Sequence, residues 1–130
     1  MVAPEKVVAK RGATQDVQFT IQVKSGYHVN SNKPDDEYLI PLKFTFASDG
    51  PVQVVEVQYP KPTLEKLQFS TKPVSVFQGD VPTTAKVKTD AAAPAGPAHI
   101  TGKLRYQACN DRMCLAPRTL EIKVPVEIRN

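Results

Sequence analysis

Apolar residues recur at every second position along most of this chain. In the segment VQFTIQV (17–23), Val, Phe, Ile and Val alternate with Gln and Thr. Such alternation is typical of β-strands that have one buried face. The same pattern occurs in the segments 42–46, 55–59, 85–89, 100–108 and 120–128. We therefore expect these six segments to form strands.

The rest of the pattern argues against helices. No stretch of ten or more residues repeats apolar residues at helical spacing, and twelve prolines are spread over the chain. About seven short strands with turn signals every eight to twelve residues or so predict an antiparallel sandwich. We predict a single all-β, immunoglobulin-like domain over residues 1–130, with its core from about residue 15 to residue 128.

Charge and hydropathy exclude several classes of protein. The formal charge is +4, but the lysines are spread along the chain with acidic residues between them, so we expect no nucleic-acid binding. No apolar run approaches the roughly eighteen residues of a membrane span, so we expect this chain to meet a membrane only through a parent chain or a partner. We also expect a monomer. The first ten residues, MVAPEKVVAK, lack the apolar segment of a signal peptide. If the protein is exported, we expect that segment to have been removed.

Both cysteines lie in the segment YQACNDRMCLAP (106–117), with four residues between them. The alternation of the preceding strand predicts that Cys109 points to the polar, outward face. The cysteines flank the connection between two antiparallel strands, where facing Cα atoms lie about 4.5–5.5 Å apart, within disulfide range. A bridge across about six residues stabilises the fold by only about 2 kcal/mol. The pair is therefore placed poorly as a staple and well as an exposed, exchangeable disulfide.

Spacing alone leaves other interpretations open. A structural hairpin disulfide in an exported protein fits as well as a redox-active one. A zinc site needs four ligands, and only His28 and His99 remain as further soft donors. Met113 beside Cys114 would suit Cu(I), which prefers thiolate and thioether ligands. We expect His28, in GYHVN, to be a surface or turn residue rather than the base of a Cys–His hydrolase.

Two segments resemble a known family. YQACNDRMCLAP, followed by an apolar strand, resembles the signature of the amino-terminal periplasmic domain of DsbD-type thiol:disulfide interchange proteins. GYHVNSNKPDDEYLIPLKFTF resembles a stretch found early in many such domains. The resemblance spans about residues 15–128. It implies an immunoglobulin-like sandwich in the periplasm, in agreement with the strand count.

The resemblance also implies an activity and its partners. A membrane-linked thioredoxin-like domain reduces such a domain, which passes the electrons to periplasmic thioredoxin-like acceptors, among them disulfide isomerases and cytochrome c maturation proteins. By this resemblance Cys109 and Cys114 are the redox pair; Cys114 forms the mixed disulfide with partners and Cys109 resolves it. We expect no cofactor and no metal besides this disulfide. The competing prediction is a non-catalytic β-sandwich binding module with a structural hairpin disulfide, and a Cu(I)-binding domain is a third.

Further site residues follow from the same resemblance. The proline-bounded segment 60–73 is expected to be a loop, and in this family a cap loop lays an aromatic residue over the disulfide. Phe69, in LQFSTKP, matches that aromatic residue. Tyr27, Tyr106 and Met113 are candidates for lining the site, although for Tyr106 we favour packing on a strand face.

Overall fold

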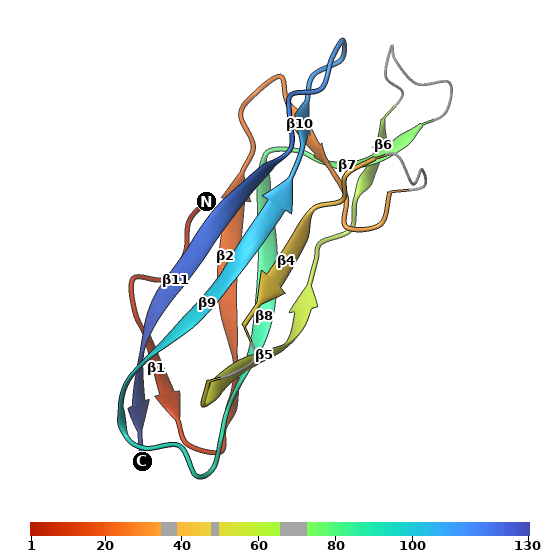
Figure 1. The fold of residues 1–130 in the computed structure, drawn as a ribbon. Helices are drawn as coiled ribbons and strands as arrows, with labels where there is room; N and C mark the ends of the chain where they lie inside the picture. The colour runs from red at the N-terminus through yellow and green to blue at the C-terminus, as the bar shows by residue number, and fades with distance from the viewer. Residues whose placement is uncertain (35–38, 48–49, 66–72) are drawn as a thin grey trace.

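The structure, a computed structural model, describes residues 1–34, 39–47, 50–65 and 73–130. These residues form eleven strands, and none of them belongs to a helix (Figure 1). It follows that the described residues include no helix able to cross a membrane. In chain order the strands are β1 (Val7–Lys10), β2 (Thr14–Gln22), β3 (His28–Asn30), β4 (Lys43–Phe46), β5 (Val52–Gln58), β6 (Thr63–Glu65), β7 (Val74–Phe77), β8 (Asp80–Thr89), β9 (Gly96–Tyr106), β10 (Ala108–Cys109) and β11 (Arg118–Arg129).

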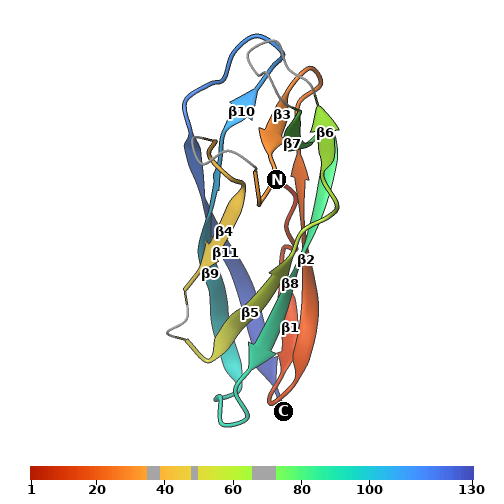
Figure 2. The ribbon, with the colours of Figure 1, turned by 90° about the vertical axis from the view of Figure 1, so that its right-hand side faces the viewer.

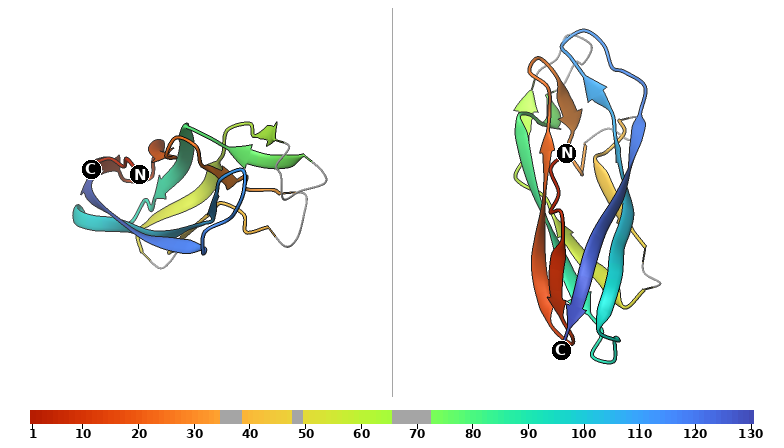
Figure 3. Two further views of the ribbon diagram at one scale, coloured as in Figure 1. Left: turned by 90° about the horizontal axis from the view of Figure 1, so that it is seen from above. Right: turned by 90° about the vertical axis from the view of Figure 1, so that its left-hand side faces the viewer.

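Two sheets form the body of the molecule, and they face each other as two layers (Figure 2). One has the strand order β1-β11-β9-β4 and the other β2-β8-β5. The antiparallel pair of β9 and β11 runs without interruption from Tyr106 opposite Arg118 to Gly96 opposite Ile128. β1 lies parallel to β11 at the edge of its sheet (Figure 3).

A third, smaller sheet with the order β10-β3-β7-β6 lies at one end of the sandwich. It occupies the end opposite the C-terminus, and the hairpin that follows β10 extends beyond it (Figure 1). This sheet positions the cysteines.

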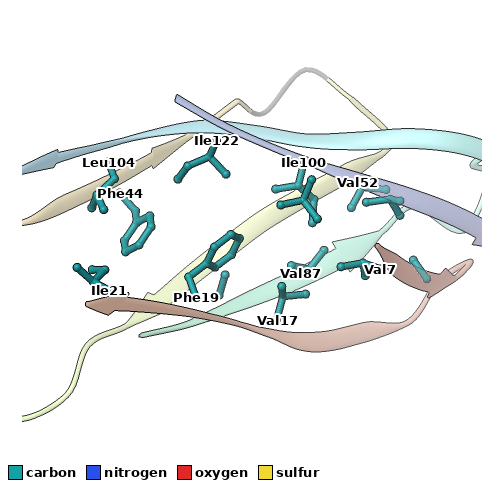
Figure 4. Close-up of a cluster of buried hydrophobic side chains, with 14 of the residues drawn as sticks. Val7, Val17, Phe19, Ile21, Phe44, Val52, Val87, Ile100, Leu104 and Ile122 are labelled. Atoms are coloured by element: carbon teal, nitrogen blue, oxygen red, sulfur yellow. The ribbon is translucent and has the colours of Figure 1, made fainter. Parts of the chain in front are cut away.

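Alternation along the long strands fills the space between the two layers. Phe19 and Val87 from one sheet face Phe44, Leu104 and Ile122 from the other (Figure 4). The rings of Phe19 and Phe44 lie 5.7 Å apart between centroids, a distance typical of favourable aromatic pairs. Each fully buried large apolar side chain contributes about 1.5–3 kcal/mol relative to exposure, so this cluster holds the sandwich together.

The structure confirms the predicted all-β, immunoglobulin-like fold, and all six predicted segments form strands. β2, β5, β8, β9 and β11 all begin earlier than predicted. Five short strands were not predicted, namely β1, β3, β6, β7 and β10. Part of the segment expected to be a loop forms β6, and Phe69 lies outside the described residues.

Candidate functional site

The chain changes sheets immediately before the first cysteine. β9 ends at Tyr106, and after Gln107 the chain continues as β10 in the small sheet. β10 pairs with β3 in the antiparallel sense, with Ala108 opposite Val29 and Cys109 opposite His28. The first cysteine is therefore held by a short strand that stands apart from the main layers.

Cys109 and Cys114 form a disulfide, and their Cα atoms lie 4.0 Å apart. The two residues also form an isolated antiparallel bridge. Next to the bridge, on the side away from the hairpin tip, the Leu115 N–H donates a hydrogen bond to the Ala108 carbonyl at 2.8 Å. The disulfide thus closes a narrow hairpin between β10 and the approach to β11.

Asn110 shapes the tip of this hairpin. Its side-chain Oδ1 accepts hydrogen bonds from the N–H groups of Arg112 at 2.9 Å and Met113 at 2.8 Å. Its own N–H donates to the Met113 carbonyl at 2.9 Å. Asn side chains often fix turns in this way. Asn110 was not predicted as a site residue, although an Asn-Asp pair between two strands is a usable turn signal.

The two cysteines differ in exposure. Cys109 is only 1% exposed, whereas Cys114 is partly exposed and the neighbouring Met113 is 57% exposed. The prediction that Cys109 lies on an exposed outward face is therefore wrong. Of the two cysteines, Cys114 is therefore the one that another protein can reach.

The burial of Cys109 has a physical reason. Alternation does continue through β10, since Ala108 packs against the main core and Cys109 points to the opposite face. That face belongs to the small sheet, however, and it is covered. Val74 and Val76 are buried on it, with Leu39 packed against them.

His28 is the cross-strand neighbour of Cys109. Directly opposite residues of an antiparallel pair share a face, with Cβ atoms about 4.5–5.5 Å apart. His28 is only 4% exposed, so the prediction of a surface or turn residue is wrong. Burial lowers the pKa of its imidazole, and the negative charge of Glu65 opposes this to a smaller extent. All three residues of β3 are buried, so no alternation in the sequence marks this strand.

The predicted lining residues lie beside the hairpin. Tyr27 and Tyr106 are both partly buried and line an apolar pocket of about 350 Å³. Ala108 and Leu115, which each adjoin a cysteine in the chain, line the same pocket. Met113 is not among its lining residues. Tyr106 also packs against the main core, so its place in the exchange site stays a prediction.

The described residues contain no group of three or more His, Cys, Asp or Glu side chains placed to hold a metal ion. His99 is exposed on β9, opposite Pro125 in the main sheet. Of the two histidines, only His28 is paired across strands with a cysteine.

Comparisons with known proteins point to one family. Residues 1–125 match the family described as "Thiol:disulfide interchange protein DsbD, N-terminal". No curated protein matches the chain. Among solved structures, the N-terminal domain of DsbD from Neisseria meningitidis, in its reduced form, is similar with a TM-score of 0.56 and 16% identity. That similarity covers 90% of this chain and 82% of the other.

A second solved structure has a lower similarity. It is a family 123 glycoside hydrolase from Clostridium perfringens, with a TM-score of 0.43 and 14% identity over 96% of this chain and 22% of the other. This similarity is too low to bear on the fold or the function. The Neisseria domain supports the fold, and the disulfide-bonded pair fits the thiol:disulfide exchange that the family is named for. Because the family match extends over nearly the whole sequence, the chain belongs to the family of DsbD N-terminal domains.

Proposed function

We propose that this chain is a periplasmic thiol:disulfide exchange domain that relays electrons through Cys109 and Cys114. Its donor is a membrane-linked thioredoxin-like domain. Its acceptors are periplasmic thioredoxin-like proteins, such as disulfide isomerases or cytochrome c maturation proteins. The observation that carries the proposal is the position of the disulfide: it closes a projecting hairpin whose second cysteine is partly exposed, away from the core that stabilises the sandwich.

The difference in exposure supports separate roles for the two cysteines. A thiolate of the reduced donor attacks Sγ of Cys114, a bond forms between these two sulfurs, and the Cys109–Cys114 bond breaks. The electron pair goes to Sγ of Cys109, which is then protonated. The second donor thiol attacks the mixed disulfide and releases the domain with two thiols. Toward an acceptor the steps run in reverse, with Cys114 attacking the acceptor's disulfide.

Little else is needed for this chemistry. Partners of the thioredoxin type bring their own activated thiols, and we propose that the domain uses no bound cofactor or metal. The exposed side chains of Met113 and Leu115 beside Cys114 offer an apolar surface on which a partner can dock. We further propose that Phe69 shields the disulfide when no partner is bound.

Trapping a partner tests the proposal. In a Cys109→Ala variant, Cys114 is first activated as its thionitrobenzoate mixed disulfide. A thioredoxin-like domain that keeps only its attacking cysteine should then displace thionitrobenzoate and form a stable mixed disulfide with Cys114, because neither protein has a second thiol to break the new bond. Alanine is chosen because position 109 is buried and alanine places no polar group there. Non-reducing electrophoresis and mass spectrometry identify the adduct.

The matched control is Cys114→Ser, which leaves only the buried thiol and should trap far less. Equal trapping by both variants would contradict the proposed roles of the two cysteines.

A redox titration of the wild-type protein distinguishes an exchangeable disulfide from a structural one. A reduction potential above about −300 mV supports exchange. A far lower reduction potential, together with no reaction with reduced thioredoxin, would instead indicate a non-catalytic binding module with a structural disulfide.

A further inference from the structure

One buried polar group in the described part of the chain has no assigned task. Nε2 of His28 finds no hydrogen-bond partner among the described residues, and the side chain is only 4% exposed. An unpaired buried polar atom costs stability, and native structures rarely keep one without a reason. Its cross-strand neighbour on the same face is Cys109.

In the reduced protein the buried Cys109 thiol must lose its proton before it can react. To resolve a mixed disulfide it must attack as a thiolate, since a thiol is a poor nucleophile. At 1% exposure it cannot readily give its proton to bulk water. An apolar surrounding also raises the pKa of a thiol, so a nearby proton acceptor is needed.

We propose that His28 is the proton acceptor for Cys109 during resolution of the mixed disulfide. This inference rests on the proposed exchange function and adds a residue to it. The Cys109 thiol gives its proton to Nε2 of the neutral imidazole. The resulting thiolate attacks Sγ of Cys114, the Cys109–Cys114 bond forms, and the bond from Cys114 to the partner breaks. The partner sulfur leaves with the electron pair, and the imidazolium returns the proton to it through water.

The same residues serve the reverse direction. When a donor thiolate attacks Cys114, the electron pair goes to Cys109, and a proton arrives there by way of His28. No oxidant or reductant is required other than the disulfide of the acceptor and the thiols of the donor. The two sulfurs change their bonds, and the imidazole ends each cycle as it began.

The other groups around His28 fit this role. Of the strands in the small sheet, β7 carries no titratable side chain and β6 carries Glu65. The Glu65 carboxylate accepts a hydrogen bond from Gln78 at 2.6 Å. Its charge acts on the imidazole and favours the protonated state once a proton is taken up. Burial is the larger influence and lowers the pKa of His28, which leaves the imidazole neutral and ready to accept at neutral pH.

Stepwise release of a coloured thiol isolates the proton transfer. The reduced full chain is mixed with dithiobis(nitrobenzoate): attack by Cys114 releases one thionitrobenzoate, and attack by Cys109 releases the second. Thionitrobenzoate leaves as an anion and needs no proton, so the second phase reports how fast Cys109 becomes a thiolate. We expect His28→Gln to slow the second phase about tenfold or more at pH 7 and to leave the first phase within about twofold, because general bases typically contribute 10²–10⁴-fold. The deficit should shrink as the pH rises.

His99→Gln is the matched control, since that histidine is exposed and lies on β9. It should match the wild type in both phases. A second phase that is unchanged in His28→Gln overturns the role of His28. Absence of any release from the wild-type protein would instead overturn the proposed exchange function, so the two failures are distinguishable.

A measurement on the wild-type protein covers the case in which His28→Gln does not fold. Imidazole ¹⁵N resonances are followed against pH in the oxidised and reduced protein. We expect Nε2 of His28 to move toward the shift of a hydrogen-bonded nitrogen on reduction, and its titration to become coupled to that of Cys109. The imidazole resonances of His99, which lies on β9, should be alike in the two redox states. Identical behaviour of His28 in the two redox states would also overturn the inference.

Discussion

His28 makes the stability of this protein depend on pH, because its imidazole is buried in the neutral form. Burial lowers the pKa of the folded-state group below its usual value near 6.5. Between the folded-state pKa and about pH 6.5, the unfolded chain therefore binds more protons than the native protein. The free energy of unfolding rises with pH across this window and falls as the pH drops through it.

We predict that the oxidised protein loses stability when the pH is lowered below about 6.5, in the range where most carboxylates remain ionised. The urea midpoint measured from about pH 7.5 to pH 5 checks this. His28→Gln should show a flatter dependence in the same range, since glutamine cannot be protonated. His99→Gln should keep the wild-type slope. Parallel curves for all three proteins would show that His28 is not the group responsible.

At the scale of strands, alternation predicts the long elements and the four-residue β4, and it misses the other short ones. β2, β8, β9 and β11 bury one face against the opposite sheet, so their sequences carry a period of two. In β3 and β7 every residue is buried, because both faces of the small sheet are covered. Without a polar face there is no alternation to detect. The burial of Cys109 was missed for a related reason. Alternation correctly predicted that its side chain points away from the main core, but the sequence did not reveal the small sheet that covers it.

Gly102 shows how closely β9 and β4 approach each other. It lies on β9 opposite Phe46 of β4. A Cβ atom at this position would lie 2.6 Å from the Thr45 carbonyl oxygen and 2.7 Å from Cδ1 of Phe46. One of these contacts is to backbone, so the clash cannot be relieved by a side-chain rotation alone.

We predict that Gly102→Ala lowers the free energy of unfolding by about 1–3 kcal/mol, the usual cost of overpacking. Equilibrium unfolding in urea measures the change. Gly50→Ala is the matched control, because a Cβ there meets nothing within 4 Å and Gly50 has no positive φ. If the Gly102→Ala protein were as stable as the Gly50→Ala protein, β4 would be able to move away from the added methyl group without loss of stability.

Across the whole molecule, the residues that stabilise the fold and those proposed to carry the chemistry lie in different places. The core lies between the two main layers, and neither cysteine belongs to its cluster. Alternation in the sequence indicated the core-facing residues of the six predicted strands, but the core also includes Val7 and Ala9, which lie before the predicted start near residue 15. The sequence did not predict His28 as a neighbour of the cysteines, because the pairing of β3 with β10 joins segments about eighty residues apart in the chain. Such pairings depend on the tertiary fold rather than on any local pattern.

This separation predicts that the sandwich survives loss of the disulfide. The bond closes a loop of only about six residues, so the unfolded chain gains little freedom when the bond is removed. We expect a Cys109→Ala, Cys114→Ser double variant to lose about 2 kcal/mol or less, with an unchanged urea m-value, because the same surface is still exposed on unfolding. Reduction of the wild-type protein should give a similar loss. A double variant that is unfolded in buffer would mean that the bond is structural, and a domain that must lose this bond in every cycle could not then act as an electron carrier.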